Sequence, residues 1–264
     1  MTKAAALLAL TACGGSLRAP VVPAAEIPVE PLAEPAAPKE VPTARVDAAK
    51  GEDLADAPLP APQPIVDGCP ADMAPIGRYC IDRYEAPNVR GEVPLALQTA
   101  YDGEAWCAAR RKRLCSQEEW VRACEGPHGR RYPYGDEYRD GVCNDDHPWI
   151  LVHWGALAKW PRGAALEEAT RLMQADMSGA RAECVSEEGV YDLTGNVAEW
   201  VRRSSPSSRP FYDHVLKGCY WAGCYKEPHP SCAFTNGVHP GTFRTYEAGF
   251  RCCARRTPGL TSAP

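Results

Sequence analysis

Segment 189–200, which reads GVYDLTGNVAEW, holds the residues best suited to bind a hard metal ion. Asp192, Asn196 and Glu199 carry side-chain oxygens, and Gly195 lets the backbone bend so that carbonyl oxygens can converge. Calcium takes about six to eight oxygen ligands from loops of this kind. A turn closed by hydrogen bonds from Asx side chains explains the same spacing without a metal. The segment therefore predicts either a calcium loop or a tight turn.

Cysteines are the next candidates for chemistry, because the chain has 13 of them among 264 residues. They form no repeated C-x-x-C pairs and no Cys/His ladder, so zinc is the weaker explanation. Disulfides formed in an oxidising compartment are the better one. The net charge of −5 argues against a nucleic-acid partner, which needs a basic face. The single basic run, 110–113, is interpreted as the solvated end of a helix.

The N-terminal residues predict a bacterial lipoprotein. Lys3 precedes an apolar run over residues 4–12, and LTAC at 10–13 is typical of a lipobox, whose cysteine becomes lipidated. We expect a signal peptide over 1–13, a membrane anchor on Cys13, and a location outside the cytoplasm, either periplasmic or on the cell surface. Removing Cys13 from the 13 cysteines leaves 12, an even number that could all pair.

The remaining sequence predicts one folded domain behind a tether. Residues 14–66 are rich in Pro and Ala, which favours a disordered, semi-rigid tether, and 257–264 is a short disordered tail. Between them, 67–256 is rich in Cys, Trp, Tyr and Gly. A helix over 102–109 with Asp102 as its N-cap is expected, and Ser116 begins a second helix with a capping box to Glu119.

Short strand-like pieces complete the domain. They lie at 79–83, 215–217 and 249–253, and Gly, Pro, Asn and Asp break the backbone between them. A few helices, short strands and abundant loops indicate an α+β domain. Disulfides would compensate for so much irregular backbone.

Six segments, in this order and with sensible gaps, resemble those of a known family. They are GRYCIDRYEAPN (77–88), RKRLCSQEEWVRAC (111–124), YPYGDEY (132–138), GVYDLTGNVAEW (189–200), LKGCYW (216–221) and GFRCC (249–253). Together they resemble the sulfatase-modifying-factor domain of the formylglycine-generating enzymes. The resemblance implies a disulfide-rich α+β variant of the C-type lectin fold with little regular secondary structure.

The resemblance also implies particular disulfides and calcium ligands. It pairs Cys107 with Cys252 and Cys124 with Cys232. Three further pairings do not come from the resemblance. Cys69–Cys80 is expected because the two residues are close in sequence. Parity and elimination suggest Cys143–Cys184 and Cys115–Cys253. The residues that the resemblance assigns to calcium are Asp192, Gly195, Val197 and Glu199 in a first site, and Asn144 and Asp145 in a second.

Cys219 and Cys224 form a C-x4-C pair of the kind that the family's oxidase uses to bind copper(I). Soft thiolates select this ion, and the enzyme converts a cysteine of a C-x-P-x-R peptide to formylglycine. The register differs, however, because Cys219 stands where the resemblance expects Gly. Ala198 stands where it expects the Trp of the oxygen site. A further structural disulfide is therefore the competing interpretation of this pair.

Three functions remain open from the sequence. The first is an envelope-anchored copper-dependent oxidase that modifies a protein cysteine. The second is a non-catalytic module that binds a peptide or a glycan outside the cytoplasm. The third is a divergent oxidative maturation enzyme. The redox state of Cys219 and Cys224 separates the first from the second.

Overall fold

The computed structural model describes residues 63–224, 227 and 229–257. Its helices are α1 (Ala100–Ala109), α2 (Gln117–Glu125), α3 (Trp154–Leu157) and α4 (Gly163–Leu172). Its strands are β1 (Ile65–Val66), β2 (Cys69–Pro70), β3 (Met73–Ile76), β4 (Tyr79–Asp82), β5 (Arg113–Leu114), β6 (Ala198–Arg202), β7 (His214–Lys217), β8 (Thr235–Asn236), β9 (Ala248–Phe250) and β10 (Cys252–Arg255). The α+β class and the small amount of regular structure are confirmed.

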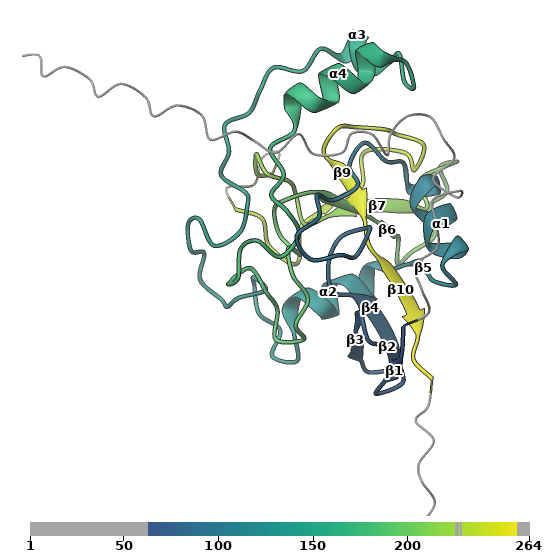
Figure 1. Cartoon of the computed structure of the whole chain (residues 1–264), viewed down its shortest axis with the longest axis vertical. Helices are drawn as coiled ribbons and strands as arrows, with labels where there is room; N and C mark the ends of the chain where they lie inside the picture. Colours follow the sequence, from purple (N-terminus) through teal and green to yellow (C-terminus); the bar gives the residue numbers. More distant parts are fainter. Residues whose placement is uncertain (1–62, 225–226, 228, 258–264) are drawn as a thin grey trace, which may run out of the picture. The chain divides into compact units, whose positions relative to one another are not determined.

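Two four-stranded sheets organise the domain (Figure 1). One has the order β3-β4-β10-β5 and is antiparallel throughout. The other has the order β8-β7-β6-β9, in which β6 pairs with β9 in parallel and with β7 antiparallel. Arg251 alone separates β9 from β10, so one short C-terminal segment ties the two sheets together.

The helix starts follow from capping chemistry. α2 begins after Ser116, whose side chain accepts from the backbone N–H of Glu119 while the Glu119 carboxylate accepts from that of Ser116, as expected. The predicted start of α1 was wrong by two residues, and its predicted N-cap by three. Its N-cap is Thr99, and Asp102 is the third helical residue, which closes the capping box from the other side.

Helices α3 and α4 were not predicted. Neither N-cap residue makes a side-chain hydrogen bond to its helix, so the usual start signal is absent from the sequence. The two helices pack against each other (Figure 1). Ala169 and Leu172 of α4 are buried in an apolar cluster that also contains Trp221 and Tyr246. Tertiary packing, and not local propensity, therefore stabilises this pair.

Six disulfides join cysteines of the described residues, at sequence separations from 5 to 145. They are Cys69–Cys80, Cys107–Cys252, Cys115–Cys253, Cys124–Cys232, Cys143–Cys184 and Cys219–Cys224. The first five are the pairings expected from the sequence. Two of them join the C-terminal strand β10 to α1 and to the residue after β5, and a third ties the end of α2 to the loop before β8.

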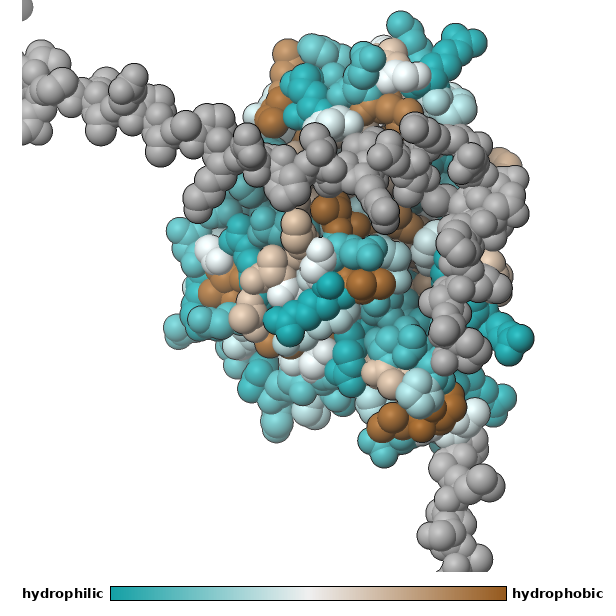
Figure 2. All heavy atoms as spheres, viewed as in Figure 1, coloured by the Kyte–Doolittle hydropathy of each residue, from teal (hydrophilic) through white to brown (hydrophobic). Residues whose placement is uncertain are grey.

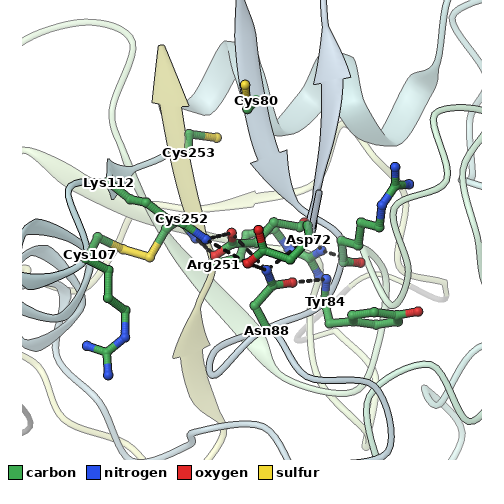
Figure 3. A network of polar contacts seen from close by, with 12 residues as sticks. Asp72, Cys80, Tyr84, Asn88, Cys107, Lys112, Arg251, Cys252 and Cys253 are labelled. Atoms are coloured by element: carbon green, nitrogen blue, oxygen red, sulfur yellow. Dashed lines mark hydrogen bonds and ion pairs between the residues drawn. A yellow bond between two sulfur atoms is a disulfide. The ribbon is translucent and has the colours of Figure 1, made fainter. Parts of the chain in front are cut away.

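The basic run 110–113 is not simply a solvated helix end. Lys112 is mostly buried, and its ammonium group lies 2.5 Å from a carboxylate oxygen of Asp82 and 3.3 Å from one of Asp72. The Asn88 amide donates to the same two carboxylates, and its oxygen accepts from the backbone of Tyr84 (Figure 3). The network fastens the loop after β4 to the loop after α1.

Cys13, the expected signal peptide and most of the expected tether lie outside the described residues. In the part that the structure does describe, none of the helices combines the length and the apolar character that crossing a bilayer requires. The face shown in Figure 2 is mostly hydrophilic, with small separate apolar patches.

Candidate functional site

The segment 189–200 is buried and reaches its conformation through left-handed residues. Asp192, Gly195 and Asn196 all have positive φ, between 57° and 77°. A Cβ on Gly195 would lie only 2.3 Å from the carbonyl oxygen of Asn144, so only glycine fits there. The backbone N–H of Asn196 donates to that same oxygen at 2.7 Å. The two segments expected to bind calcium therefore pack directly against each other.

Glu199 is fully buried and bound by nitrogen donors. Nη2 of Arg251 lies 2.6 Å from Oε1 of Glu199, and Nε of Arg251 lies 2.7 Å from Oε2. Nε1 of Trp120 also donates to Oε2, at 2.8 Å. Both carboxylate oxygens face N–H groups, so Glu199 does not fit a calcium ligand in this arrangement.

Two more carboxylates surround the same guanidinium group. Glu85 accepts from the Ser178 hydroxyl at 2.8 Å and from the Asn196 amide at 2.9 Å. Asp192 accepts from the backbone N–H of Gly179 at 2.7 Å. Burial raises the pKa of Asp192 to about 6 and raises the pKa of Glu85 well above its usual value. Arg251 is thus the positive centre of a buried acidic cluster.

The guanidinium group of Arg181 donates hydrogen bonds to oxygens around the second expected calcium site. Arg181 donates to the carbonyl oxygens of Gly141 at 2.9 Å and Cys143 at 2.8 Å, and to the Asp176 carboxylate at 2.7 Å. It also reaches the Asn144 side-chain oxygen at 3.4 Å. A guanidinium with five donors matches convergent oxygens of this kind.

The last residue expected to bind calcium is Asp145, through its backbone carbonyl oxygen. Its carboxylate accepts a hydrogen bond from the Tyr138 hydroxyl at 3.2 Å, and burial raises its pKa to about 6. Across the described residues, His, Cys, Asp and Glu side chains do not gather in threes at any point that suits a metal ion. Calcium binding through the remaining oxygens, Asn144 and the carbonyls of Gly195 and Val197 among them, stays a prediction.

This arrangement gives a test of the calcium assignment. We expect the change in melting temperature on adding calcium to be the same in the wild type and in Glu199→Gln, because Arg251 already engages Glu199. Thermal unfolding with calcium and with a chelator measures that change. A calcium-dependent rise that Glu199→Gln abolishes would restore Glu199 as a ligand. Glu183→Gln, which alters an exposed carboxylate paired with Arg139, is the matched control.

A cleft of about 810 Å³ opens beside the second sheet, over β7 and β8. Its size is that of a small-molecule or peptide site. Its aromatic lining consists of Trp149, Trp154, Tyr220, Phe234, Phe243 and Tyr246. Trp149 and Trp154 are 59% and 53% exposed, so the rim offers large apolar surfaces to solvent. Exposed aromatic side chains that gather in a hollow are typical of a binding site.

Cys219 and Cys224 lie on the wall of this cleft and form a disulfide. Cys219 follows β7 with a φ of 62°, a conformation unusual for a residue other than glycine. In the disulfide state neither sulfur is a thiolate, and thiolates are what copper(I) requires. Ala198 also lines the cleft. Only a methyl group stands at the position where the resemblance expects an oxygen-site Trp.

Two charged residues of the cleft were not found by sequence reasoning. Lys217 is fully buried, and its ammonium group donates to the Thr235 hydroxyl at 3.0 Å and to the Phe234 carbonyl. Burial lowers the pKa of Lys217 to about 8. Glu247 accepts from the Thr245 hydroxyl at 3.0 Å, and burial raises its pKa to about 7. Lys217 lies inside the segment LKGCYW, but nothing in that segment signals its burial, and Glu247 lies outside all six segments.

Comparisons with known proteins agree with the motifs. Residues 80–256 match the model of the sulfatase-modifying factor enzyme 1-like domain. The inactive C-alpha-formylglycine-generating enzyme 2 of Bos taurus is 29% identical over 174 residues, 64% of this chain and 53% of that protein. Its namesake from Mus musculus is 30% identical over 133 residues, 49% of this chain and 38% of that protein. The chain thus spans about half the length, or less, of these curated relatives.

Solved structures also align with the chain at low identity. CarF aligns with a TM-score of 0.46 and 15% identity, over 68% of this chain and 87% of that one. PvdO from Pseudomonas aeruginosa aligns with a TM-score of 0.45 and 16% identity, over 74% of this chain and 89% of that one.

Proposed function

Because this chain belongs to the family of sulfatase-modifying factor enzyme 1-like domains, we propose that it is a ligand-binding module with the family's fold and without its copper chemistry. The observation that carries the proposal is the Cys219–Cys224 disulfide on the wall of an aromatic cleft. The bridge stabilises the wall and removes the two thiolates that the oxidase reaction needs.

The proposed location is the cell envelope, with a lipid on Cys13 as anchor. The six disulfides support an oxidising compartment outside the cytoplasm. The composition of 14–66 supports a spacer between membrane and domain. The ligand is a peptide or a glycan, because the cleft is open to solvent along a rim that carries Trp149 and Trp154.

Thiol counting and copper titration test this proposal. We expect alkylation followed by mass spectrometry of the non-reduced protein to find Cys219 and Cys224 unlabelled. Anaerobic titration with copper(I) against a competing chelator should then give the same weak binding in the wild type and in the double variant Cys219→Ser, Cys224→Ser. A C-x-P-x-R peptide incubated with copper and oxygen should remain unmodified.

The oxidase function makes the opposite prediction. Under mild reductant the Cys219–Cys224 bridge would open, and tight copper(I) binding would appear that Cys224→Ala abolishes. That result would replace the binding module with the copper-dependent oxidase. Loss of the peptide thiol without formylglycine would instead favour the divergent maturation enzyme. A variant of the distant Cys69–Cys80 pair serves as the control for general effects of losing a disulfide.

A further inference from the structure

Within the described residues, the Glu247 carboxylate in the cleft forms no ion pair. Glu247 lines the cleft, and no ion pair joins it to any Lys, Arg or His among the described residues. Lys217, the other charged residue of the lining, directs its ammonium group to Phe234 and Thr235 instead. Glu247 is partly buried, and withdrawing a carboxylate from water without a cation is costly. A ligand that supplies the cation would recover this cost.

Aromatic rings line the same cleft as the Glu247 carboxylate, and such rings suit a cation. The Tyr246 ring lies 6.0 Å from Tyr220 and 6.5 Å from Trp154, measured between centroids, and the Phe243 ring lies 6.5 Å from Trp154. The faces of such rings attract ammonium groups within about 6 Å. A hydrocarbon stem can pack along the same rings while its charged end reaches a polar group.

Hydroxyl groups beside Glu247 favour a primary ammonium over a quaternary one. The Tyr246 and Tyr220 hydroxyls lie 3.5 Å apart, and burial raises the pKa of both, with a further increase from the charge of Glu247. A primary ammonium has three N–H donors, which the carboxylate and the two hydroxyl oxygens can accept. A quaternary ammonium has none, so it would add no hydrogen bond to these oxygens.

We propose that this end of the cleft binds a primary alkylammonium group, the side chain of a lysine in a peptide partner. The inference rests on the proposed binding function and names its ligand. The stem of the lysine packs between Trp154 and Tyr246, and its ammonium group pairs with Glu247. The two exposed tryptophans of the rim then contact the peptide on either side of the lysine.

Binding should strengthen as the pH rises through 7. Burial raises the pKa of Glu247 to about 7, so the free carboxyl is largely protonated at pH 6 and ionised at pH 8. The lysine is protonated at both values, and the affinity should therefore rise about tenfold over this interval. The other titratable groups facing the site are Tyr220, Tyr246, Lys217 and His239, while Arg244 is paired with Asp102.

Lys217 and His239 change the profile in ways that can be separated. Burial lowers the pKa of Lys217 to about 8 and lowers that of His239 below its usual value. Both lose positive charge as the pH rises, which favours a cationic ligand in the same direction as Glu247. In Glu247→Gln the carboxyl contribution disappears, so the pH dependence that remains belongs to these two groups.

The test uses the full chain, with Nα-acetyl-lysine methylamide as the probe, whose side-chain amine is free. Isothermal titration calorimetry measures its binding. N-acetyl-norleucine methylamide is the matched neutral probe, since it has the same stem without the amine. At pH 8 we expect the lysine probe to bind at least about tenfold more tightly than the norleucine probe. Glu247→Gln should abolish that preference, and Trp154→Ala should weaken both probes. Glu92→Gln, an exposed carboxylate outside the cleft, should change nothing.

Four results would overturn the inference. Equal binding of the two probes would show that the charge is not recognised, and a preference that survives in Glu247→Gln would place the recognition elsewhere. Tighter binding of choline than of the lysine probe would replace the primary ammonium with a quaternary one. Failure of the lysine probe in a protein whose Cys219 and Cys224 stay bridged contradicts this inference and leaves the binding function intact. Opening of the bridge with copper uptake contradicts the binding function itself.

Discussion

Replacing Arg251 with Met is expected to lower the free energy of unfolding by about 3–5 kcal/mol, the cost of breaking a buried ion pair by removing one partner. Arg251 and Glu199 are both fully buried, and Arg251 also donates to the carbonyl oxygens of Asp82 and Tyr191. Its loss leaves a buried cluster of carboxylates without their cation. Urea unfolding at pH 7 measures the effect.

The pH dependence of this variant identifies the cause. Burial already raises the pKa values of Glu85 and Asp192, and without the Arg251 cation they rise further above their values in the unfolded chain. The charged carboxylates then cost stability as the pH rises from the unfolded pKa values, about 4, towards the folded ones, and the cost disappears as the pH falls below the unfolded values. The deficit should therefore shrink between pH 7 and pH 5. A deficit that is constant with pH would indicate lost packing instead.

Two matched variants complete the experiment. Arg202→Met removes an exposed arginine whose guanidinium lies 2.5 Å from Glu104, and it should cost less than about 1 kcal/mol. The double variant Arg251→Met, Glu199→Gln removes both charges and should recover part of the loss, because neither partner is left charged and alone. If the double variant were as unstable as the sum of the single ones, the ion pair would not be the source.

The sequence predicted the scaffold better than the chemistry, and the reason is physical. The capping box at Ser116 is a local pattern that fixes a helix start. Cysteines pair in limited ways, and the family resemblance supplied two of the pairs. α4 lacks a cap, and its apolar face is matched by Trp221 and Tyr246, which lie far along the chain. A helix stabilised in that way leaves no local signal.

The site shows the same limit. Asp192 and Glu199 were singled out because their side-chain oxygens could bind calcium, and both are buried, but the sequence does not show which cation faces them. Arg251 follows Glu199 by 52 residues and meets it only because β6 pairs with β9. Tyr246 and Glu247 are neighbours in the chain, but Trp154 and Tyr220 meet Tyr246 only through tertiary packing. Composition suggests binding residues, whereas their partners depend on tertiary structure.

Removing the Cys124–Cys232 disulfide with two Ala substitutions is expected to cost about 5 kcal/mol. The bridge closes a loop with a sequence separation of 108, and in the chain-entropy model a loop of about 100 residues contributes nearly 5 kcal/mol. Removing Cys69–Cys80, with a separation of 11, should cost about 3 kcal/mol in the same model. Urea unfolding without reductant measures both. Equal losses would contradict an origin in the entropy of the unfolded chain.

The Cys124–Cys232 variant should also bind ligand more weakly, because this bridge supports one wall of the cleft. Cys232 is two residues before Phe234, whose carbonyl accepts from the Lys217 ammonium group, and β8 follows at once. Freed from α2, this wall should release Lys217 and lower the affinity for the lysine probe. Cys69 and Cys80 pack in a separate cluster with Met73, so their loss should leave affinity unchanged. If both variants bound equally well, the bridge would stabilise the fold without shaping the cleft.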